Sequence, residues 1–332
     1  MKKVLLARID NIGDFILTTP FISALCDSLS PLKIVFIASP YTYPLVKKMK
    51  IIDEVIVLDA KKETIINKLA LINRIRKEKF DIAIFFHPST LLAIIIGLSK
   101  AKIRIGYEFG WVRPFSSPFY WLLTHRILST REAIEDHMVT HFLKPLKILG
   151  IPFPTSPKLT IPEDKTEEAK VEAFLLKEGF NLNNDKIIAL QLCPKWIEDG
   201  WEEEDFLKLC KKLLNCNNKV KLLILYKKEY LNQLSRFLLE AQQLGITCFG
   251  GDLFKWIYLI KNSSLFIGYD SGGIHIAVAF GKPVIDIFID PWCKSVWYPF
   301  GVPYVSLMGK HLTDQIINGA NKLLLFPEFN SL

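Results

Sequence analysis

Two short stretches of the chain place carboxylates and glycines between an apolar strand and an apolar helix. The first follows the strand "KVLLA" and contains Asp10, Gly13 and Asp14. The second follows the strand "SLFIGY" and reads D-S-G-G-I-H over residues 270–275. In parallel α/β domains, ligands bind beyond the carboxyl ends of strands, where loops lead into helix N-termini. Both stretches are therefore candidate sites.

The first stretch has two interpretations. Asp is a preferred helix N-cap, so Asp14 could simply cap the helix after a tight turn supplied by Gly13. Alternatively, Asp14 is a general base that removes the proton from a substrate hydroxyl. The G-x-G-x-x-G fingerprint and the lysine-containing phosphate loop are absent at this position, which disfavours a nicotinamide or nucleoside-triphosphate enzyme.

The second stretch has the features of an anion site. Ser271, Gly272 and Gly273 leave backbone N–H groups bare at the start of a short apolar helix, where the helix dipole favours an anion such as a diphosphate. His275 in the first turn could bond the same anion, although a lone histidine among apolar residues is more often part of a core. Asp270 could bond the amides of the turn or a ligand hydroxyl.

Short β-rich runs alternate with helix-length segments along the whole chain. Continuous apolar runs of this kind predict parallel strands covered by helices on both faces. A segment near 150–165, rich in proline and polar residues, separates two such halves. We therefore predict two doubly wound α/β domains, at 1–158 and 159–332. The predicted strands are KVLLA, KIVFIA, EVIVLD, DIAIFF and KIRIGY in the first half, and IIALQL, KLLILY, ITCFG, SLFIGY, PVIDIF and PYVSL in the second.

Composition limits the class of protein. A chain of 332 residues, half of them apolar, is long enough for two buried cores. Its six cysteines include no C-x-x-C pair, so we expect reduced thiols in a cytoplasmic protein, without disulfides or zinc. Lys2 and Lys3 precede an apolar run, but Arg8, Asp10 and Asp14 interrupt it, and we expect no signal peptide.

The net charge of +8 is unevenly distributed. Residues 1–160 carry 23 Lys and Arg against 13 Asp and Glu, whereas the remainder carries 19 against 21. This asymmetry predicts that the first half meets an anionic partner, either nucleic acid or an anionic lipid surface.

Aromatic and cationic residues are interleaved in the basic half. Arg104, Trp111, Arg113, Trp121 and Arg126 fall within one short region. This mixture suits an acceptor or membrane surface, and it suits equally a loop that packs on its own domain.

Two histidines four residues apart could form half of a metal site. His137 and His141 lie beside Asp136 on a predicted helix. No further ligand converges by spacing, so we favour a packed or solvated helix face and expect no metal.

Taken together, these motifs resemble one enzyme family. The pairing of "ARIDNIGDFILTTP" with "LFIGYDSGGIHIAVAFGKPVI" is similar to glycosyltransferase family 9, the ADP-heptose:lipopolysaccharide heptosyltransferases. "EDHMVTHFLKPLKILGI", "GWEEEDFLKL" and "WYPFG" extend the resemblance over nearly the whole chain. Each motif is weak alone, but their order and spacing are specific.

The resemblance implies a GT-B architecture, in which two Rossmann-like domains face a central cleft. The first domain would bind the acceptor and the second the nucleotide-sugar donor, and the last helix could pack back on the first domain. Members are inverting and metal-independent, and they need no cofactor beyond the nucleotide sugar.

The resemblance also implies roles for particular residues. Asp14 takes the place of the family's catalytic base. Glu229 falls near the position where the family has an acidic residue that contacts the nucleoside. One departure is Asp199, which stands where the family usually has a lysine that contacts the donor phosphates. Lys195 could compensate, the donor could differ, or catalysis could have been lost. The predicted donor-binding set is Asp10, Asn11, Gly13, Lys195, Glu229, Asp270, Ser271, Gly272, Gly273 and His275.

We therefore predict an enzyme that transfers heptose from ADP-heptose to a lipopolysaccharide core or related glycan. It would be cytoplasmic and peripheral at the inner face of the inner membrane. The alternatives are a GT-B glycosyltransferase with another donor, and a non-catalytic paralogue that binds nucleotide or glycan. A nucleic-acid-binding module would explain the basic half but not Asp14 or the D-S-G-G turn.

Overall fold

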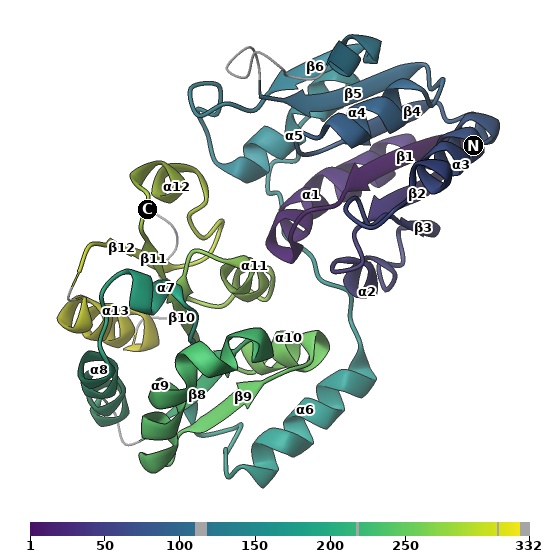
Figure 1. Cartoon of the computed structure of the whole chain (residues 1–332). Coiled ribbons are helices and arrows are strands. Elements are labelled where there is room, and N and C mark those ends of the chain that lie inside the picture. Colours follow the sequence, from purple (N-terminus) through teal and green to yellow (C-terminus); the bar gives the residue numbers. More distant parts are fainter. Residues whose placement is uncertain (110–117, 217–218, 311, 326–332) are drawn as a thin grey trace. The chain divides into compact units, whose positions relative to one another are not determined.

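The computed structural model describes residues 1–109, 118–216, 219–310 and 312–325. The chain divides into two compact units, Met1–Pro162 and Glu163–Leu332, whereas the sequence placed the boundary after residue 158. Each unit is built on a six-stranded parallel sheet with helices on its faces (Figure 1). This is the α/β class that the alternation of apolar runs predicts.

In the first unit, all five predicted strands are present. The sheet order is β3-β2-β1-β4-β5-β6, with every neighbouring pair parallel. The strand that the sequence did not predict is β6, an edge strand whose side chains are mostly exposed. The elements are β1 (Lys2–Arg8), α1 (Ile12–Leu29), β2 (Leu32–Ala38), α2 (Tyr43–Val46), β3 (Glu54–Val57), α3 (Ile65–Glu78), β4 (Ile82–Phe85), α4 (Thr90–Gly97), β5 (Ile103–Glu108), the 3₁₀ helix η2 (Pro118–Leu122), β6 (His125–Leu128) and α5 (Met138–Ile148).

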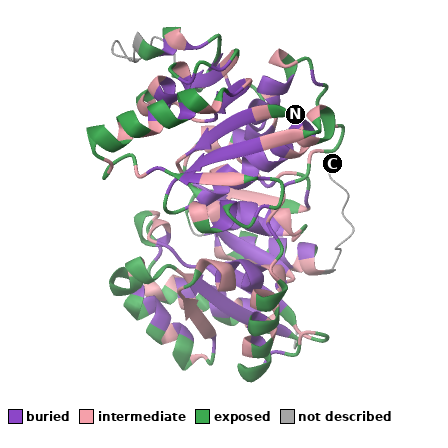
Figure 2. Cartoon of the chain, turned by 90° about the vertical axis from the view of Figure 1, so that its right-hand side faces the viewer, coloured by how far each residue is buried: buried purple, intermediate pink, exposed green. Residues whose placement is uncertain are grey.

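Helices cover both faces of this sheet. On one face, α3, α4 and η2 bury apolar side chains against the strands in a single core cluster. On the other face, α1 packs against α5. The strands lie buried between these partly exposed layers (Figure 2), as expected for a parallel sheet.

Helix α1 has a broken backbone ladder that is repaired locally. Pro20 lacks the N–H that would bond the Ile16 carbonyl, and the Thr19 hydroxyl donates to that carbonyl at 2.6 Å. Among the described helices, α1 has the length and apolar character of a membrane span, and 61% of that window is buried inside the protein.

The second unit repeats the same topology. Its sheet order is β12-β11-β10-β7-β8-β9, again parallel throughout, and all six predicted strands are present. The elements are α6 (Lys165–Lys177), β7 (Lys186–Gln191), α7 (Lys195–Glu198), α8 (Glu203–Asn215), β8 (Val220–Tyr226), the 3₁₀ helix η3 (Lys228–Tyr230), α9 (Leu231–Gln243), β9 (Thr247–Gly250), α10 (Leu253–Lys261), β10 (Leu265–Tyr269), α11 (Gly272–Ala279), β11 (Val284–Phe288), α12 (Pro291–Val296), β12 (Tyr304–Met308) and α13 (Thr313–Leu325).

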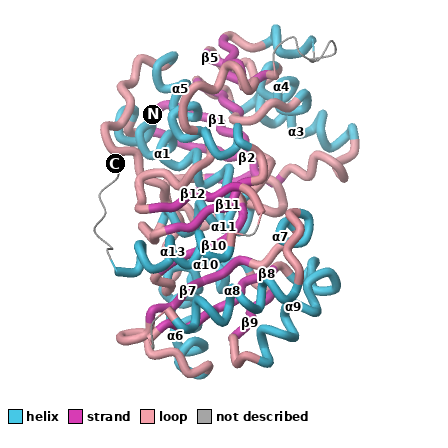
Figure 3. Tube along the Cα trace, turned by 90° about the vertical axis from the view of Figure 1, so that its left-hand side faces the viewer, coloured by secondary structure: helices cyan, strands magenta, loops and turns pink. Residues whose placement is uncertain are grey.

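Two helical layers enclose this second sheet (Figure 3). Helices α8, α9 and α13 bury their apolar sides in one core cluster, while α6, α10 and α11 pack along the other face. Helix α13 therefore belongs to the core of the second unit, through Ile316, Ala320 and Leu323.

In both units the order of strands reverses beside the first strand. The reversal falls between β1 and β4 in the first unit and between β7 and β10 in the second. In doubly wound sheets, ligands bind outside the carboxyl ends of the strands at such a switch point. The topology thus points to the residues that follow β1, β4, β7 and β10.

Candidate functional site

Asp14 lies in the first turn of α1, as its third residue, and not at the N-cap position. The helix begins at Ile12 after Asn11, which holds the N-cap position in an extended conformation. Gly13 is the second helical residue and is absent from the positive-φ positions, so it does not form the tight turn that the sequence suggested. Asp14 therefore does not hold the N-cap position, although its carboxylate accepts hydrogen bonds from Asn11, which does.

A buried arginine binds both carboxylates of this stretch. Arg8, the last residue of β1, is 2% exposed. Its Nε and Nη2 donate to the two oxygens of Asp10 at 2.8 and 3.0 Å, and Nη2 donates to Asp14 Oδ1 at 3.0 Å. The ring of Phe142 lies 4.2 Å from the guanidinium carbon and covers it.

Burial makes Asp14 a weaker acid than an ordinary aspartate, although Arg8 lies beside it. Burial raises the pKa of Asp14 to about 6, Arg8 opposes this rise, and the charge of Asp10 adds to it. A carboxylate with a pKa near 6 is ionised at neutral pH and still basic enough to accept a proton from a hydroxyl.

His87 joins this group from the neighbouring strand. It follows β4, which pairs with β1, and its Nδ1 is buried without a hydrogen-bond partner. Burial lowers its pKa, while Asp10 raises it and Arg8 lowers it. The sequence interpretation missed both Arg8 and His87. The switch-point rule, applied to the end of β4, would have selected His87.

The two histidines of α5 have structural contacts. His137 caps the helix, because its Nδ1 accepts the Val139 N–H at 3.0 Å. His141 is buried against Tyr107, and burial lowers its pKa to about 3. They form a packed helix face.

The D-S-G-G turn of the second unit leaves a helix N-terminus bare. Helix α11 starts at Gly272, and the N-cap Ser271 makes no capping bond. Its hydroxyl instead donates to Gln191 Oε1 at 2.6 Å. A Cβ on Gly273 would lie 2.7 Å from both Gln191 Oε1 and the Phe266 ring. The glycine therefore permits close packing that no larger residue fits.

Lys195 reaches this turn from the neighbouring strand. It begins α7 just after β7, and its Nζ donates to the backbone carbonyl of Asp270 at 2.6 Å. Burial raises the pKa of Asp270, Lys195 opposes the rise, and Asp290 adds to it. The ammonium group of Lys195 thus lies beside the bare N-terminus of α11. A cation at this place is what the hypothesis requires if Lys195 replaces the lysine that the family usually has at the position of Asp199.

Asp199, the departure from the family pattern, is held by the end of β10. Its Oδ2 accepts the hydroxyl of Tyr269 at 2.6 Å. This bond fixes the carboxylate beside the strand that leads into the D-S-G-G turn. The carboxylate thus accepts a hydrogen bond from the residue that precedes the turn, whereas the charges that act on Asp270 in the turn are those of Lys195 and Asp290.

A second buried carboxyl lies in the middle of β11. Asp286 is fully buried, and neither of its oxygens has a hydrogen-bond partner. Burial raises its pKa well above the ordinary value, the charge of Asp270 adds to the rise, and Lys195 opposes it. Burial therefore disfavours the ionised form of Asp286, and no sequence motif singled this residue out.

The other predicted donor residues occupy the expected edge of the sheet. Glu229 lies in η3, which follows β8, and its exposed side chain lies 3.6 Å from Lys227. His275 is buried in the first turn of α11, with its ring 6.1 Å from that of Trp297. Because β8, β7 and β10 are neighbours in this order, Glu229, Lys195 and the D-S-G-G turn share one edge.

The predicted aromatic and cationic surface is only partly described. Trp111 and Arg113 lie outside the described residues. Trp121 is 74% exposed, and Arg126 is exposed and lies 3.7 Å from Glu108. Arg104 donates to the carbonyls of Leu122 and Ala101, so its guanidinium holds η2 in place.

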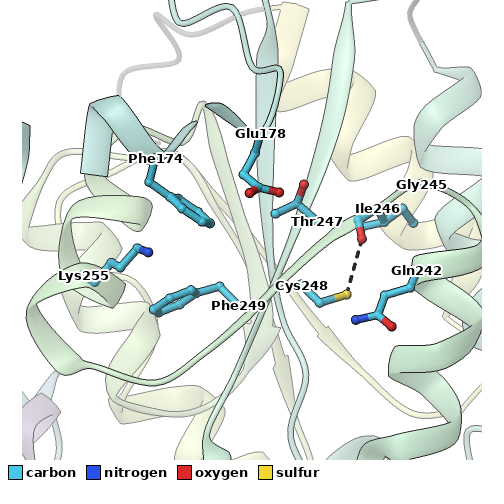
Figure 4. Close-up of a pocket in the computed structure, with 9 residues that line it drawn as sticks. All are labelled: Phe174, Glu178, Gln242, Gly245, Ile246, Thr247, Cys248, Phe249 and Lys255. Carbon is cyan, nitrogen blue, oxygen red and sulfur yellow. Dashed lines mark hydrogen bonds between the residues drawn. The ribbon is translucent and has the colours of Figure 1, made fainter. Parts of the chain in front are cut away.

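A cavity of about 370 Å³ opens beside the edge strand β9 (Figure 4). The ammonium of Lys255 points between the rings of Phe174 and Phe249, 3.5 and 4.6 Å from their centroids. This cation fastens α6 to β9 and α10. The cavity contains none of the predicted site residues. Its lining is Phe174, Glu178, Gln242, Gly245, Ile246, Thr247, Cys248, Phe249 and Lys255.

The six cysteines are free thiols. Within the described ranges, no group of three or more His, Cys, Asp or Glu side chains could hold a metal ion.

Two Rossmann-type units, one with a half-buried carboxylate and the other with a bare helix N-terminus, give the chain a GT-B fold, as in E. coli ADP-heptose lps heptosyltransferase II, which has a TM-score of 0.75 at 16% identity. The model of glycosyltransferase family 9 (heptosyltransferase) matches residues 68–292, and the chain belongs to this family. It is thus a glycosyltransferase of the heptosyltransferase type, as the sequence motifs predict.

Relatives of known structure or name agree with this assignment. The chain is 24% identical over 327 residues to lipopolysaccharide heptosyltransferase 3 of Escherichia coli K12, covering 91% of this chain and 89% of that protein. A family 9 glycosyltransferase from Veillonella parvula superposes with a TM-score of 0.81 at 20% identity, over 98% and 97% of the chains. The E. coli heptosyltransferase WaaC, solved with ADP-2-deoxy-2-fluoro heptose, gives a TM-score of 0.70 at 14% identity, over 97% and 99%.

Proposed function

We propose that this enzyme is an inverting, metal-independent heptosyltransferase. It transfers heptose from ADP-heptose to a lipopolysaccharide core or a related glycan, and needs no cofactor besides the nucleotide sugar. The observation that carries this proposal is Asp14, a carboxylate of raised pKa held by Arg8 at the switch point of the first unit. The proposed site is cytoplasmic, at the inner face of the inner membrane.

Asp14 acts as the general base in the proposed reaction. The acceptor hydroxyl oxygen attacks the anomeric carbon of the heptose, and its proton passes to an oxygen of Asp14. The bond between that carbon and the diphosphate oxygen breaks, and ADP leaves with the electron pair. Attack from the face opposite the leaving group inverts the anomeric carbon.

The second unit stabilises the leaving diphosphate. The backbone N–H groups at the start of α11 and the positive end of its dipole favour developing negative charge. Lys195 lies beside them and adds a full positive charge. These groups supply the stabilisation for which other enzymes use a divalent metal, which supports a metal-independent reaction.

Named relatives support the choice of donor and acceptor. WaaC was solved with an ADP-heptose analogue, and the E. coli relative is named as a lipopolysaccharide heptosyltransferase. The exposed Glu229 at the end of β8 is our candidate for the nucleoside contact.

A second candidate is a paralogue that binds the nucleotide sugar without turnover, or that uses another donor. The observation that favours it is Asp199, a carboxylate at the position where the family usually has a lysine, held by the hydroxyl of Tyr269. A negative charge near a diphosphate weakens its binding.

The test is transfer by the purified enzyme onto heptose-deficient lipopolysaccharide, with ADP-heptose, UDP-sugars and GDP-sugars compared, each with and without EDTA. We expect product from ADP-heptose alone, with inverted anomeric configuration by NMR and no loss in EDTA. Product from another nucleotide sugar would overturn the donor, and binding without product would support the second candidate.

A further inference from the structure

Helix α3 exposes an apolar stripe that its own fold does not cover. Ile65, Ile66 and Leu69 are 76%, 77% and 55% exposed, while Ile72 and Ile75 on the same helix are buried against the sheet. One face of α3 thus completes the core. The three exposed apolar residues lie in the first turns of the helix.

The same stripe continues into cations. At 100° per residue, Leu69 lies one turn after Ile65 on the same side of the helix. Arg76 and Lys77 lie about three turns after Ile65 and Ile66 and point in nearly the same directions. Arg76 and Lys77 are exposed. Glu78 lies on a different flank, where it pairs with Lys3 at 3.0 Å. The stripe therefore contains no carboxylate.

Further lysines precede the helix. Lys61 and Lys62 are exposed, and neither they nor Arg76 and Lys77 have an ion-pair partner in the described part of the chain. Seven Lys and Arg stand against three acids over residues 59–79. The charge is available to an anionic partner.

We propose that this α3 stripe, formed by Ile65, Ile66, Leu69, Arg76 and Lys77, docks the enzyme on an anionic phospholipid surface. Three apolar side chains are too few for a stable protein interface, which buries about 800 Å² per partner. A few apolar residues flanked by Lys and Arg are what an interfacial helix uses. Lys61 and Lys62 at the helix start extend the basic surface.

The position of the stripe suits a membrane-anchored acceptor, and in this respect the inference rests on the proposed function. Helix α3 follows β3 and therefore begins at the carboxyl edge of the sheet, the edge at which Asp14 stands. Helices α3 and α4 are neighbours in one layer with η2 (Figure 3). The exposed Trp121 of η2 belongs to the same layer.

The experiment measures sedimentation of the full chain with vesicles of phosphatidylcholine, with and without about 30% phosphatidylglycerol. We expect the wild type to bind only the anionic vesicles. The pair Ile65→Asp and Ile66→Asp should abolish binding, and Arg76→Gln with Lys77→Gln should weaken it about 25-fold, or about fivefold per cation. Leu239→Asp, at an apolar residue on α9 that is 56% exposed, is the control and should bind as the wild type does.

Transfer onto a soluble, deacylated acceptor separates this proposal from the proposed function. The α3 variants should keep wild-type transfer on that acceptor, because the stripe includes none of the residues to which the proposed reaction assigns a role. If the wild type fails to bind anionic vesicles, or the Ile65 and Ile66 variant still binds, the docking proposal is wrong whatever the transfer assay shows. It is also wrong if sedimentation velocity shows a wild-type dimer that these substitutions dissociate, since the stripe would then join two copies.

Discussion

At the carboxyl end of β1, a buried arginine is divided between two carboxylates, whereas at the carboxyl end of β10 a helix N-terminus is left bare beside a lysine. Both positions lie at the switch point of their units, but β1 is the first strand of its sheet in chain order and β10 is the fourth. They differ in the sign of the group that they offer to a ligand. The same switch point can thus supply a base in one unit and an anion site in the other.

The difference depends on how each charge is compensated. In the first unit, burial raises the pKa of Asp14 more than Arg8 lowers it, and the charge of Asp10 adds to the rise, so Asp14 remains basic. In the second unit, Lys195 donates one hydrogen bond to a backbone carbonyl, which carries no net charge. Its charge is therefore still available to a ligand.

The largest effect should come from removing the base. Asp14→Asn should lower kcat by a factor of about 10²–10⁴, because no base then takes the proton from the hydroxyl of the acceptor substrate. Unfolding should not explain the loss. The folded pKa of Asp14, about 6, lies above the ordinary 3.8. Ionised Asp14 therefore lowers the free energy of unfolding from about pH 4 upward, and most above pH 6. The Asn variant should thus not have a lower unfolding temperature than the wild type at pH 7. Steady-state kinetics and thermal unfolding check both points, and a variant with wild-type kcat would remove Asp14 from the mechanism.

The next effect should come from crowding the anion site. Gly273→Ala places a methyl group against Gln191 and Phe266, which should displace the start of α11 and weaken donor binding by about tenfold or more. Val278→Ala, at the other end of α11, is the control because it lowers stability without touching the N-terminus. Equal donor affinity in the two variants would show that the helix start does not bind the donor.

Lys195 tests whether a cation compensates for Asp199. Lys195→Met should weaken ADP binding by about tenfold, the value of a charged hydrogen bond, while Lys211→Met on the exposed face of α8 should not change it. The measurement is calorimetric titration with ADP. Unchanged affinity in Lys195→Met would mean that the helix amides alone hold the diphosphate.

Asp10 gives the smallest and most specific effect. Asp10→Asn removes a negative charge that raises the pKa of Asp14 and leaves Arg8 to pair with Asp14 alone. The pKa of Asp14 should fall, so the acid limb of the pH–kcat profile should move to lower pH by about one unit. Asp27→Asn, on the exposed end of α1, should leave the profile in place. An acid limb that stays where it is would show that another group controls it.

Much of the fold could be predicted from sequence because buried parallel strands are continuous apolar runs. Strand β6 could not, since it lies at the sheet edge and only Ile127 of its four residues is buried. The start of α1 was misplaced by two to three residues because Asn11 and Asp14 are both acceptable caps locally.

The site could be predicted only where one local segment forms it. The D-S-G-G turn is such a segment. Arg8 looked like the charged end of a strand, because its burial depends on Phe142 from a helix far along the chain. The reach of Lys195 to Asp270 depends in the same way on the pairing of β7 with β10, which no local pattern encodes.

The central claim is that the base and the donor site are separate groups in separate units. Calorimetric titration of ADP-heptose into Asp14→Asn and Gly273→Ala, side by side with the wild type, tests it most directly. We predict that Asp14→Asn binds the donor as the wild type does and that Gly273→Ala binds it at least about ten times more weakly. Equal loss of donor binding in both variants would contradict the account.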